Sequence, residues 1–473
     1  MIYIHWIVLV AYTIVALVAL VTVLMEHRQP AKTMAWALIL VFMPLAGIVL
    51  YFFFGQRTRK EKHIWQNSLD QLTKRSMLEF VEQRNLRLPN RHRELIGLFV
   101  NQNWALPFKN NETEIYESGY EFFPALLQAI AKAKHHIHII TYIMTDDATG
   151  HLVADALIAR AREGVEVRFL YDDVGSWKTK DSFFERMREE GIEVHPFMPV
   201  RFPLFTRKVN YRNHRKICVI DGTVGFIGGM NIADRYIQGS GKQPWRDTHV
   251  KISGAVVYGL QRAFLIDWFY VDRTLITDRK YYPNTRVEPN DCLAQIVTSS
   301  PTSQWPEIEQ GYVKILLNAR TYVYMETPYF LPTEPILFAM RTAAVSGIDV
   351  RLMIPLKTDT KIVEWASRTY VMEAVRAGVR VMLYKTGFNH SKLLVSDDSL
   401  CSIGSSNVDF RSFENNFEAN VFFYDERMAL KVKQLFYKDE THSVPLEELK
   451  DITHRSFLQR LWESLVRLLS PLL

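Results

Sequence analysis

The sequence is poor in cysteine, and its cysteines are far apart. Only three occur in 473 residues, and they are Cys218, Cys292 and Cys401. An odd, widely spaced set suggests neither the disulfide framework of a secreted domain nor a zinc site, and it fits a reducing compartment. No histidine pair has an obvious metal-binding spacing either. We therefore expect a functional site without a metal and without another cofactor.

A long block of basic residues is also absent. The formal net charge is +6, which is mild for a chain of this length. A dedicated nucleic-acid binder usually concentrates far more positive charge on one surface. The charge balance fits an anionic substrate or a membrane surface, and it argues against a nucleic-acid partner. The length itself predicts two to three structural units.

Charged side chains are missing from two runs near the N-terminus. Ile2 to Met25 contains no Asp, Glu, Lys or Arg, and Thr33 to Phe54 is equally apolar. Each run is long enough to cross a hydrocarbon core of about 30 Å. The link between them is short, polar and contains Pro30. Residues 1–60 are therefore predicted to form a two-span transmembrane hairpin. A cleaved signal peptide is the alternative, but it would require a basic start and a shorter apolar core.

The basic residues around these runs predict their orientation. Arg28 and Lys32 lie in the link, and a larger cluster follows the second run, formed by Arg57, Arg59, Lys60 and Lys62. Positive charge is retained on the cytoplasmic side of a membrane. We therefore expect a multi-pass protein whose remaining chain, like its N-terminus, lies on the cytoplasmic side.

Two later segments repeat each other without a gap. They are NHRKICVIDGTVGFIGGMN at 213–231 and NHSKLLVSDDSLCSIGSSN at 389–407. The shared positions are His214 and His390, Lys216 and Lys392, Val219 and Val395, Asp221 and Asp397, Ile227 and Ile403, Gly228 and Gly404, and Asn231 and Asn407. EGVEVRFLYD and SGIDVRLMIP match independently, upstream of these segments. We infer an internal duplication.

The spacing within each copy predicts its chemistry. On a strand, side chains alternate between two faces, so the histidine and the lysine two positions later lie on the same face. Asn231 and Asn407 follow a glycine turn and can donate to an oxygen. Two facing copies would make a pocket of two His, two Lys and two Asn, which suits a phosphodiester. A single His-x-Lys pair is usually an accident of a core strand, but two full-length matches are not.

The doubled pattern resembles the H-x-K-x(4)-D-x(6)-G-x(2)-N motif of the phospholipase D superfamily. The resemblance implies a two-step transfer in which His214 attacks phosphorus and His390 acts as acid and base. It also implies that the motif residues Lys216, Asp221, Lys392 and Asp397 belong to the catalytic set and that Asn231 and Asn407 bind the substrate phosphate. The two aspartates lie on the opposite face from His and Lys, so we expect them to hold the turn rather than touch phosphate.

The same resemblance implies a carboxylate for each histidine. In each half an acidic residue lies some thirty positions past the histidine, Asp247 in PWRDTHV and Glu418 in NNFEANV. Such a group accepts a hydrogen bond from the catalytic imidazole, which fixes its tautomer and favours its charged form. The alternative for either residue alone is an ordinary surface acid.

Over nearly the whole chain the sequence is similar to the bacterial cardiolipin synthases of this superfamily. The similarity rests on PLAGIVLYFFFGQ, YDDVGSW, ETPYFLPTEPI, GFNHSK and NVDFRSFENNFEANVFFYD. It implies a bacterial cell-membrane enzyme that converts two phosphatidylglycerols to cardiolipin and glycerol, with these lipids as its partners and no nucleic acid. A membrane-bound phospholipase D that hydrolyses lipids or uses another alcohol stays open. A nuclease is disfavoured by the apolar runs, and an inactive scaffold by the intact motifs.

The remaining pattern predicts an α/β fold of two duplicated halves packed as one pseudo-twofold unit. Helix-period runs alternate with short apolar runs, which favours a mainly parallel sheet. The first half is expected at 111–290 and the second at 291–440, after a linker or docking segment at 61–110. Residues 441–473 are expected to form an amphipathic helix, either on the membrane surface or packed on the catalytic core.

Overall fold

The computed structural model describes residues 2–25, 30–51, 88–200, 210–239, 241, 244–284, 292–449 and 454–471. The chain divides into two compact units. One consists of Met1–Ile64 with Val200–Tyr211, and the other of Trp65–Pro199 with Arg212–Leu473. Both halves of the duplication therefore belong to a single unit. The link at 26–29 and residues 52–87 lie outside the described residues.

The described residues of the N-terminal unit form the helices α1 (Ile2–Met25), α2 (Pro30–Phe42) and α3 (Pro44–Leu50). Pro44 opens α3, where its missing N–H costs nothing, so the second apolar run is two helices instead of one. Val23, Leu40 and Tyr51 are buried together. Within the described ranges, no helix combines the length and the apolar character needed to cross a membrane.

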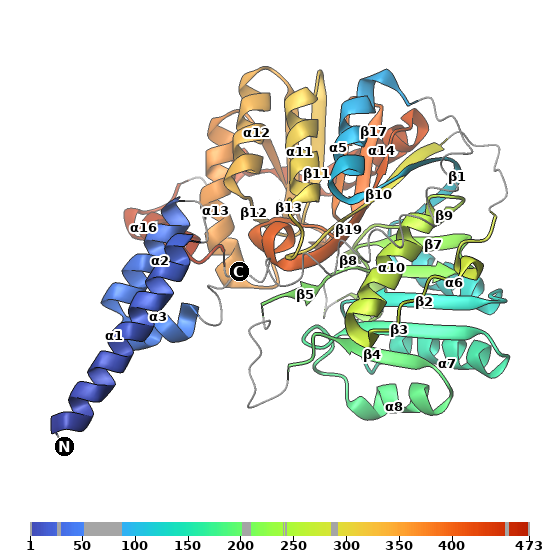
Figure 1. The fold of residues 1–473 in the computed structure, drawn as a ribbon. Helices are drawn as coiled ribbons and strands as arrows, with labels where there is room; N and C mark the ends of the chain where they lie inside the picture. The colour runs from blue at the N-terminus through green and yellow to red at the C-terminus, as the bar shows by residue number, and fades with distance from the viewer. Residues whose placement is uncertain are drawn as a thin grey trace. The chain divides into compact units, whose positions relative to one another are not determined.

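The larger unit, called the catalytic unit below because it contains both copies of the motif, is built on one sheet (Figure 1). Apart from β20 at one edge, the strand order of this sheet corresponds from the two ends inward. The order is β20-β14-β13-β11-β16-β17-β19-β10-β1-β9-β7-β6-β2-β3-β4. The two halves meet where β1 pairs antiparallel with β10. The first-half strands are β1 (Pro107–Tyr116), β2 (His136–Thr141), β3 (Glu166–Asp172), β4 (Glu193–Phe197), β6 (Ile217–Ile220), β7 (Val224–Gly228) and β9 (His249–Ser253). Their counterparts are β10 (Cys292–Ser299), β11 (Tyr322–Glu326), β13 (Asp349–Pro355), β14 (Arg380–Tyr384), β16 (Leu393–Ser396), β17 (Leu400–Gly404) and β19 (Asn416–Phe423), with β20 (Ser443–Pro445) at the edge. The duplication in sequence is thus a pseudo-twofold in space.

The expectation of a mainly parallel sheet was wrong, because the sheet is mixed. Along the strand order given above, the parallel neighbours are those of β2-β3-β4 and β11-β13-β14, and the other neighbours are antiparallel. Each motif forms an antiparallel hairpin, β6 with β7 and β16 with β17. The turns between these strands are too short for the crossover that parallel neighbours need. The apolar residues of each motif form a strand, which begins three residues after the histidine, and their pattern carries no information on strand direction.

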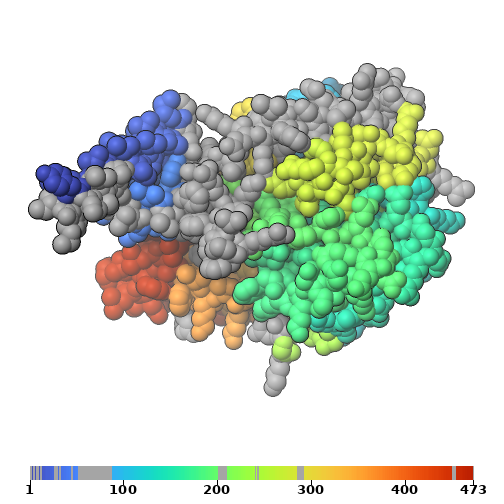
Figure 2. Space-filling view, turned by 60° about the horizontal axis from the view of Figure 1, so that its bottom comes forward, coloured from blue at the N-terminus to red at the C-terminus, as the bar shows by residue number. Residues whose placement is uncertain are grey.

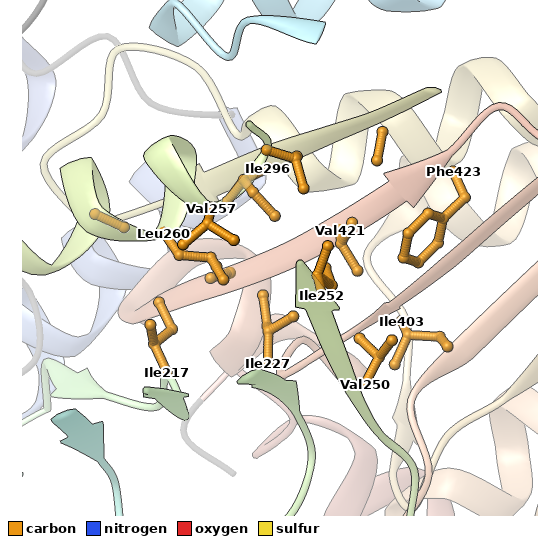
Figure 3. Packing of buried hydrophobic residues seen from close by; sticks show 14 of the residues in the cluster. Ile217, Ile227, Val250, Ile252, Val257, Leu260, Ile296, Ile403, Val421 and Phe423 are labelled. Atoms are coloured by element: carbon orange, nitrogen blue, oxygen red, sulfur yellow. The ribbon is translucent and has the colours of Figure 1, made fainter. Parts of the chain in front are cut away.

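Helices cover both faces of the sheet and divide the core into layers. On one face α10 (Val257–Asp272) and α14 (Glu426–Thr441) cover a single cluster that runs across both halves. Figure 3 shows Ile252 and Ile227 of the first half together with Val421 of the second half in this cluster. The other face carries one cluster per half. Its helices are α6 (Gly119–Ala131), α7 (Ala148–Arg162) and α8 (Asp181–Glu189) in the first half, and α5 (Arg93–Asn103), α11 (Glu307–Asn318), α12 (Glu334–Val345) and α13 (Lys361–Arg376) in the second. The shared cluster makes the two halves one folding unit.

Part of the segment expected to be a linker belongs to this core. Helix α5 buries Leu95, Ile96 and Phe99 in the second-half cluster, and the Phe99 ring lies 4.7 Å from that of Phe422. Strand β1 then carries the chain into the first half. The N-terminal approach to the first half is therefore packed on the second half, which ties the two together.

The C-terminal helix α16 (Phe457–Arg467) packs on the catalytic unit through its polar side. Glu463 is only 2 % exposed and forms ion pairs with Arg368 of α13, at 3.4 Å, and with Arg455. The Arg467 guanidinium lies 4.1 Å from the centre of the Tyr370 ring. The apolar side chains face outward instead and include Phe457, Leu458, Leu461, Trp462, Leu465 and Leu468, each 47 % to 75 % exposed. In Figure 2 the red C-terminal segment lies at the surface beside the orange segment. An ordinary surface helix has the opposite orientation.

Candidate active site

Both motif histidines line one pocket at a single edge of the sheet. His214 lies three residues before β6, which runs antiparallel to β2, so it is at the edge where β2 and β3 end. His390 occupies the same position before β16. The pocket has a volume of about 480 Å³. It is lined by Tyr142, Ile143, Arg212, His214, Asn231, Arg235, Tyr236, Trp245, Tyr329, Leu331, Asp359, Thr360, Val363, His390, Asn407, Asp409, Arg411 and Asn416. The topology thus brings the two copies of the motif to one cavity.

Backbone hydrogen bonds join each histidine to the other half. The short strand β5 (Arg212–Asn213) pairs in parallel with the start of β19, and the His214 N–H donates to the Phe417 carbonyl at 2.9 Å. In the mirror arrangement β15 (Phe388–Asn389) pairs with β8 (Trp245–Arg246), and the His390 N–H donates to the Arg246 carbonyl at 2.7 Å. In both cases the next residue on the partner strand is the acid predicted from the sequence.

The histidine–carboxylate pairs are therefore exchanged between the halves. The Nδ1 atom of His214 lies 3.0 Å from Oε1 of Glu418, and Nδ1 of His390 lies 2.7 Å from Oδ2 of Asp247. Both carboxylates are at most 1 % exposed. These are the two acids named from the sequence, which did not indicate which histidine each of them contacts. With Nδ1 committed to a carboxylate, Nε2 is the ring nitrogen available to a ligand.

Burial lowers the pKa of both imidazoles in the pocket. It lowers the pKa of His214 to about 4, although Glu418 acts in the opposite direction. Burial, reinforced by Lys392 and Lys216, lowers the pKa of His390 well below its ordinary value. Both rings are then neutral at neutral pH, the state in which Nε2 is a nucleophile or a base. An anion in the pocket acts against this shift, because nearby negative charge favours the protonated ring.

The motif lysines are buried against the histidines. Lys216 Nζ donates to the His214 carbonyl at 2.6 Å, and Lys392 Nζ donates to the His390 carbonyl. Burial lowers the pKa of Lys392 to about 8, and it lowers the pKa of Lys216 well below its ordinary value. The ammonium groups thus contribute positive charge from behind the imidazoles, and a bound phosphate would stabilise their charged form.

The two asparagines line the pocket in different surroundings. Asn231 accepts from the Ile143 N–H at 3.0 Å and donates to the Tyr236 hydroxyl at 2.6 Å. Asn407 donates to Asp409 at 3.0 Å, and its own Oδ1 atom is buried without a hydrogen-bond partner among the described residues. These contacts fix both amides on the pocket wall.

Asp221 and Asp397 lie away from the pocket and hold turns. Asp221 accepts from the backbone N–H groups of Lys134, His135 and His136 at 2.7–3.0 Å. Asp397 does the same for residues 320–322 at 2.8–3.0 Å. Both have a φ of 52°, in the left-handed region that favours a short polar side chain. Their inclusion in the catalytic set is therefore corrected. Each joins the motif hairpin to the neighbouring strand, as the alternation of faces predicts.

Two arginines in the pocket were missed by the motif comparison. Arg235 and Arg411 each stand 21 positions after the motif histidine, and both line the cavity. The compared motif segments end at the asparagine, four positions before each arginine. Extending the comparison by four positions would have shown an arginine in both copies. Among the residues that the structure describes, no cluster of three or more His, Cys, Asp or Glu side chains could hold a metal ion.

Matches to known proteins fall in the same two halves of the chain. The family model described as "Cardiolipin synthase, PLD-like domain" matches residues 126–252 and 312–440, one match in each half. Cardiolipin synthase 2 of Bacillus cereus is 40 % identical over 474 residues, covering 98 % of this chain and 91 % of that protein. The chain belongs to the cardiolipin synthase family. It is therefore a phosphatidyltransferase of phospholipid biosynthesis.

Other similarities agree with membership in this family. Cardiolipin synthase of Listeria monocytogenes is 39 % identical over 483 residues, covering 98 % of this chain and all of that protein. The model "Phospholipase D-nuclease N-terminal" matches residues 14–56, and it associates the protein with membranes. The crystal structure of phosphatidylserine synthase from Haemophilus influenzae covers 81 % of this chain with a TM-score of 0.63, which at 16 % identity shows a common fold.

Proposed function

We propose that this cardiolipin synthase transfers the phosphatidyl group of one phosphatidylglycerol to the terminal hydroxyl of a second, giving cardiolipin and glycerol. The observation that carries the proposal is the pair of histidines in one pocket, each held at Nδ1 by a buried carboxylate. Two imidazoles with their Nε2 atoms on one cavity suit a double displacement at phosphorus. The names of the relatives supply the product.

The first step forms a covalent intermediate. Nε2 of His214 attacks the phosphorus of the first phosphatidylglycerol, and the bond from phosphorus to the glycerol oxygen breaks. With the anionic phosphate bound, which favours the protonated ring, Nε2 of His390 carries a proton and donates it to that oxygen, so glycerol leaves as a neutral alcohol. Glu418 stabilises the positive charge that develops on the His214 ring, at an Nδ1–Oε1 distance of 3.0 Å. The product of this step is a phosphatidyl group on His214.

The second step reverses the proton transfer. The terminal hydroxyl of the second phosphatidylglycerol gives its proton to His390 and attacks phosphorus, and the bond to His214 breaks. In both steps the non-bridging oxygens carry negative charge. This charge is stabilised by Lys216, Lys392, Asn231 and Asn407. Cardiolipin leaves, and both histidines return to their starting state.

For the membrane, we propose that residues 1–60 anchor the chain as a two-span hairpin, with the catalytic unit on the cytoplasmic side. The basic cluster at 57–62 supports this orientation. We further propose that α16 rests on the bilayer. Its outward leucines would enter the interface, while ion pairs of Glu463 and Arg467 hold its polar side to α13. Helix α13 also reaches the pocket through Val363, so this contact would place the cavity near its lipid substrate.

Adding charge to the apolar side of α16 tests this arrangement. The variant Leu458→Glu/Leu461→Glu/Leu465→Glu of the full chain is expected to lose about 10-fold or more of its activity on phosphatidylglycerol in bilayer vesicles, because buried apolar area drives interfacial binding. Its activity on dispersed short-chain phosphatidylglycerol should stay at the wild-type level. Val345→Glu, at an exposed apolar position of α12, is the control for added charge. Equal losses on both substrates would contradict a membrane role for α16.

Product analysis tests the proposed reaction. Purified, detergent-solubilised protein is incubated with phosphatidylglycerol alone, and the products are identified by mass spectrometry. Cardiolipin and glycerol in equal amounts are expected. Phosphatidic acid in place of cardiolipin would keep the two-histidine chemistry but make water the acceptor, and the absence of any product would overturn the proposed substrate.

A further inference from the structure

The proposed reaction brings two phosphates into one pocket. The first is the phosphate under attack, and the second belongs to the incoming phosphatidylglycerol, whose own phosphodiester stays intact. In phosphatidylglycerol that second phosphate is separated from the reacting hydroxyl by three carbons and one ester oxygen. A second anion beside the first requires its own positive charge, because two like charges in a buried cavity repel each other strongly.

The central cluster accounts for only one of these phosphates. His214, His390 and the two motif lysines are grouped at the point of attack, and each lysine is bound to the carbonyl of its histidine. The remaining cationic side chains on the wall are Arg212, Arg235 and Arg411. Arg212 is 1 % exposed and lies 3.6 Å from Asp172, so its charge is already matched within the fold. Arg235 is the first-half member of the repeated pair that it forms with Arg411.

Arg235 lies on the side of the acid–base histidine. Its guanidinium carbon is 5.5 Å from the centre of the Trp245 ring, and the centre of that ring is 5.5 Å from the His390 imidazole. Tyr236 makes the same connection, with its ring 5.9 Å from Arg235 and 6.2 Å from His390. The positive charge of Arg235 also contributes to the lowered pKa of His390, after burial and the nearer lysines and histidine. The arginine and the histidine thus face the same region of the cavity.

No carboxylate in the described part of the chain lies within ion-pair distance of Arg235. It is half-buried, and aromatic rings hold the guanidinium by cation–π contact. Its hydrogen-bond donors therefore stay available to a ligand. A guanidinium is well suited to a phosphodiester, because its planar donors match two phosphate oxygens at once.

The position of Arg235 determines which lipid it would meet. His390 protonates the leaving glycerol and then deprotonates the incoming hydroxyl, so leaving group and acceptor occupy the same side of the pocket. We propose that Arg235 forms a second phosphate subsite that binds the phosphodiester of the acceptor phosphatidylglycerol. Free glycerol occupies the same place next to His390 but has no phosphate for Arg235. This subsite rests on the proposed function, and it explains how a lipid acceptor is selected over a small alcohol.

Two reactions of the full-length enzyme separate this subsite from the rest of the site. Cardiolipin formation from phosphatidylglycerol uses an acceptor with a phosphate, whereas exchange of labelled glycerol into phosphatidylglycerol uses one without. Arg235→Gln is expected to lower kcat/KM for cardiolipin formation by about 10- to 100-fold, the usual effect of losing one charge-assisted contact. Glycerol exchange should stay within about twofold of wild type, since it needs only the central cluster.

Two further variants make the result unambiguous. Arg235→Lys keeps the charge and should recover part of cardiolipin formation with normal exchange. Arg186→Gln removes an exposed arginine of α8, 2.8 Å from Asp155, and should change neither reaction. Equal loss of both reactions in Arg235→Gln and Arg235→Lys would overturn the proposal and assign the arginine to the central cluster or to folding. Unchanged cardiolipin formation in Arg235→Gln would overturn it as well. If the wild-type enzyme produced neither cardiolipin nor exchange, the proposed function itself would be wrong.

Discussion

Replacing His214 or His390 by alanine is expected to lower the rate of cardiolipin formation by about 10⁴-fold or more. Loss of His214 removes the atom that bonds to phosphorus. Loss of His390 removes the group that protonates the leaving glycerol and activates the acceptor. Both side chains are only 8–12 % exposed and line one pocket, so a water molecule or a neighbouring residue is poorly placed to replace either. The measurement is the amount of cardiolipin formed per enzyme over time.

A substrate with a p-nitrophenyl leaving group separates the two roles. Nitrophenolate departs without a proton, so the first step no longer needs the acid. We expect His390→Ala to release a burst of nitrophenolate and then stop as a phosphohistidine, whereas His214→Ala shows no burst. His151→Ala, an exposed histidine of α7 that lies 2.8 Å from Asp146, serves as the control. Near-wild-type turnover in either active-site variant would contradict the two-histidine mechanism. A burst only in His214→Ala would reverse the two roles.

Changing the buried carboxylates to amides is expected to have the second largest effect. Glu418→Gln and Asp247→Asn should each lower the overall rate by about 10²- to 10⁴-fold, while the melting temperature changes much less. An amide of the same shape keeps the packing, but it accepts either tautomer of the ring. The lone pair of Nε2 is then no longer directed at phosphorus, and the charged ring loses its counterion.

The exchange of partners between the halves makes this prediction specific. Because Glu418 contacts His214, Glu418→Gln should suppress the nitrophenolate burst, whereas Asp247→Asn should leave the burst and slow only the later turnover. Asp155→Asn, on the exposed side of α7, is the matched control. Suppression of the burst by Asp247→Asn alone would mean that each acid serves the histidine of its own half, against the observed distances of 3.0 and 2.7 Å.

The sequence predicted much of the fold because the local patterns are strong. Short apolar runs that alternate with helix-period runs predicted an α/β fold, and β2 and α13 are examples of the two kinds of element. Duplication predicted the pseudo-twofold, and the palindromic strand order confirms it. The direction of the strands was not predictable in this way, since alternation is the same in parallel and antiparallel strands. Nor was the burial of Phe99, because α5 packs on residues that follow it by some two hundred positions.

The sequence predicted the residues of the candidate site, but it did not predict which of them contact each other. Spacing identified His214, His390 and the two acids, because the motif and its repeat carry that information. Which acid contacts which histidine depends on the pairing of β5 with β19 and of β15 with β8. Each of these pairings joins only two residues of one strand to two of the other. Strands of two residues, such as β5, β8 and β15, are too short to show a hydrophobic periodicity in the sequence. Arg235 is absent from the predicted site for a different reason. It and its repeat Arg411 lie four positions beyond the asparagine that ends each motif.

The exchanged pairing has a consequence for how such an enzyme arises. A chain with a single copy of the motif would lack the carboxylate for its own histidine, so two molecules would have to meet before either could work. Fusing two copies replaces that encounter with an intramolecular one and removes its dependence on concentration. It also frees the copies to diverge, and they have done so. Asp faces one imidazole and Glu the other, and Arg215 in one copy stands where the other has Ser391. The reaction joins two identical lipids, but the two halves of the protein that form its active site are no longer identical.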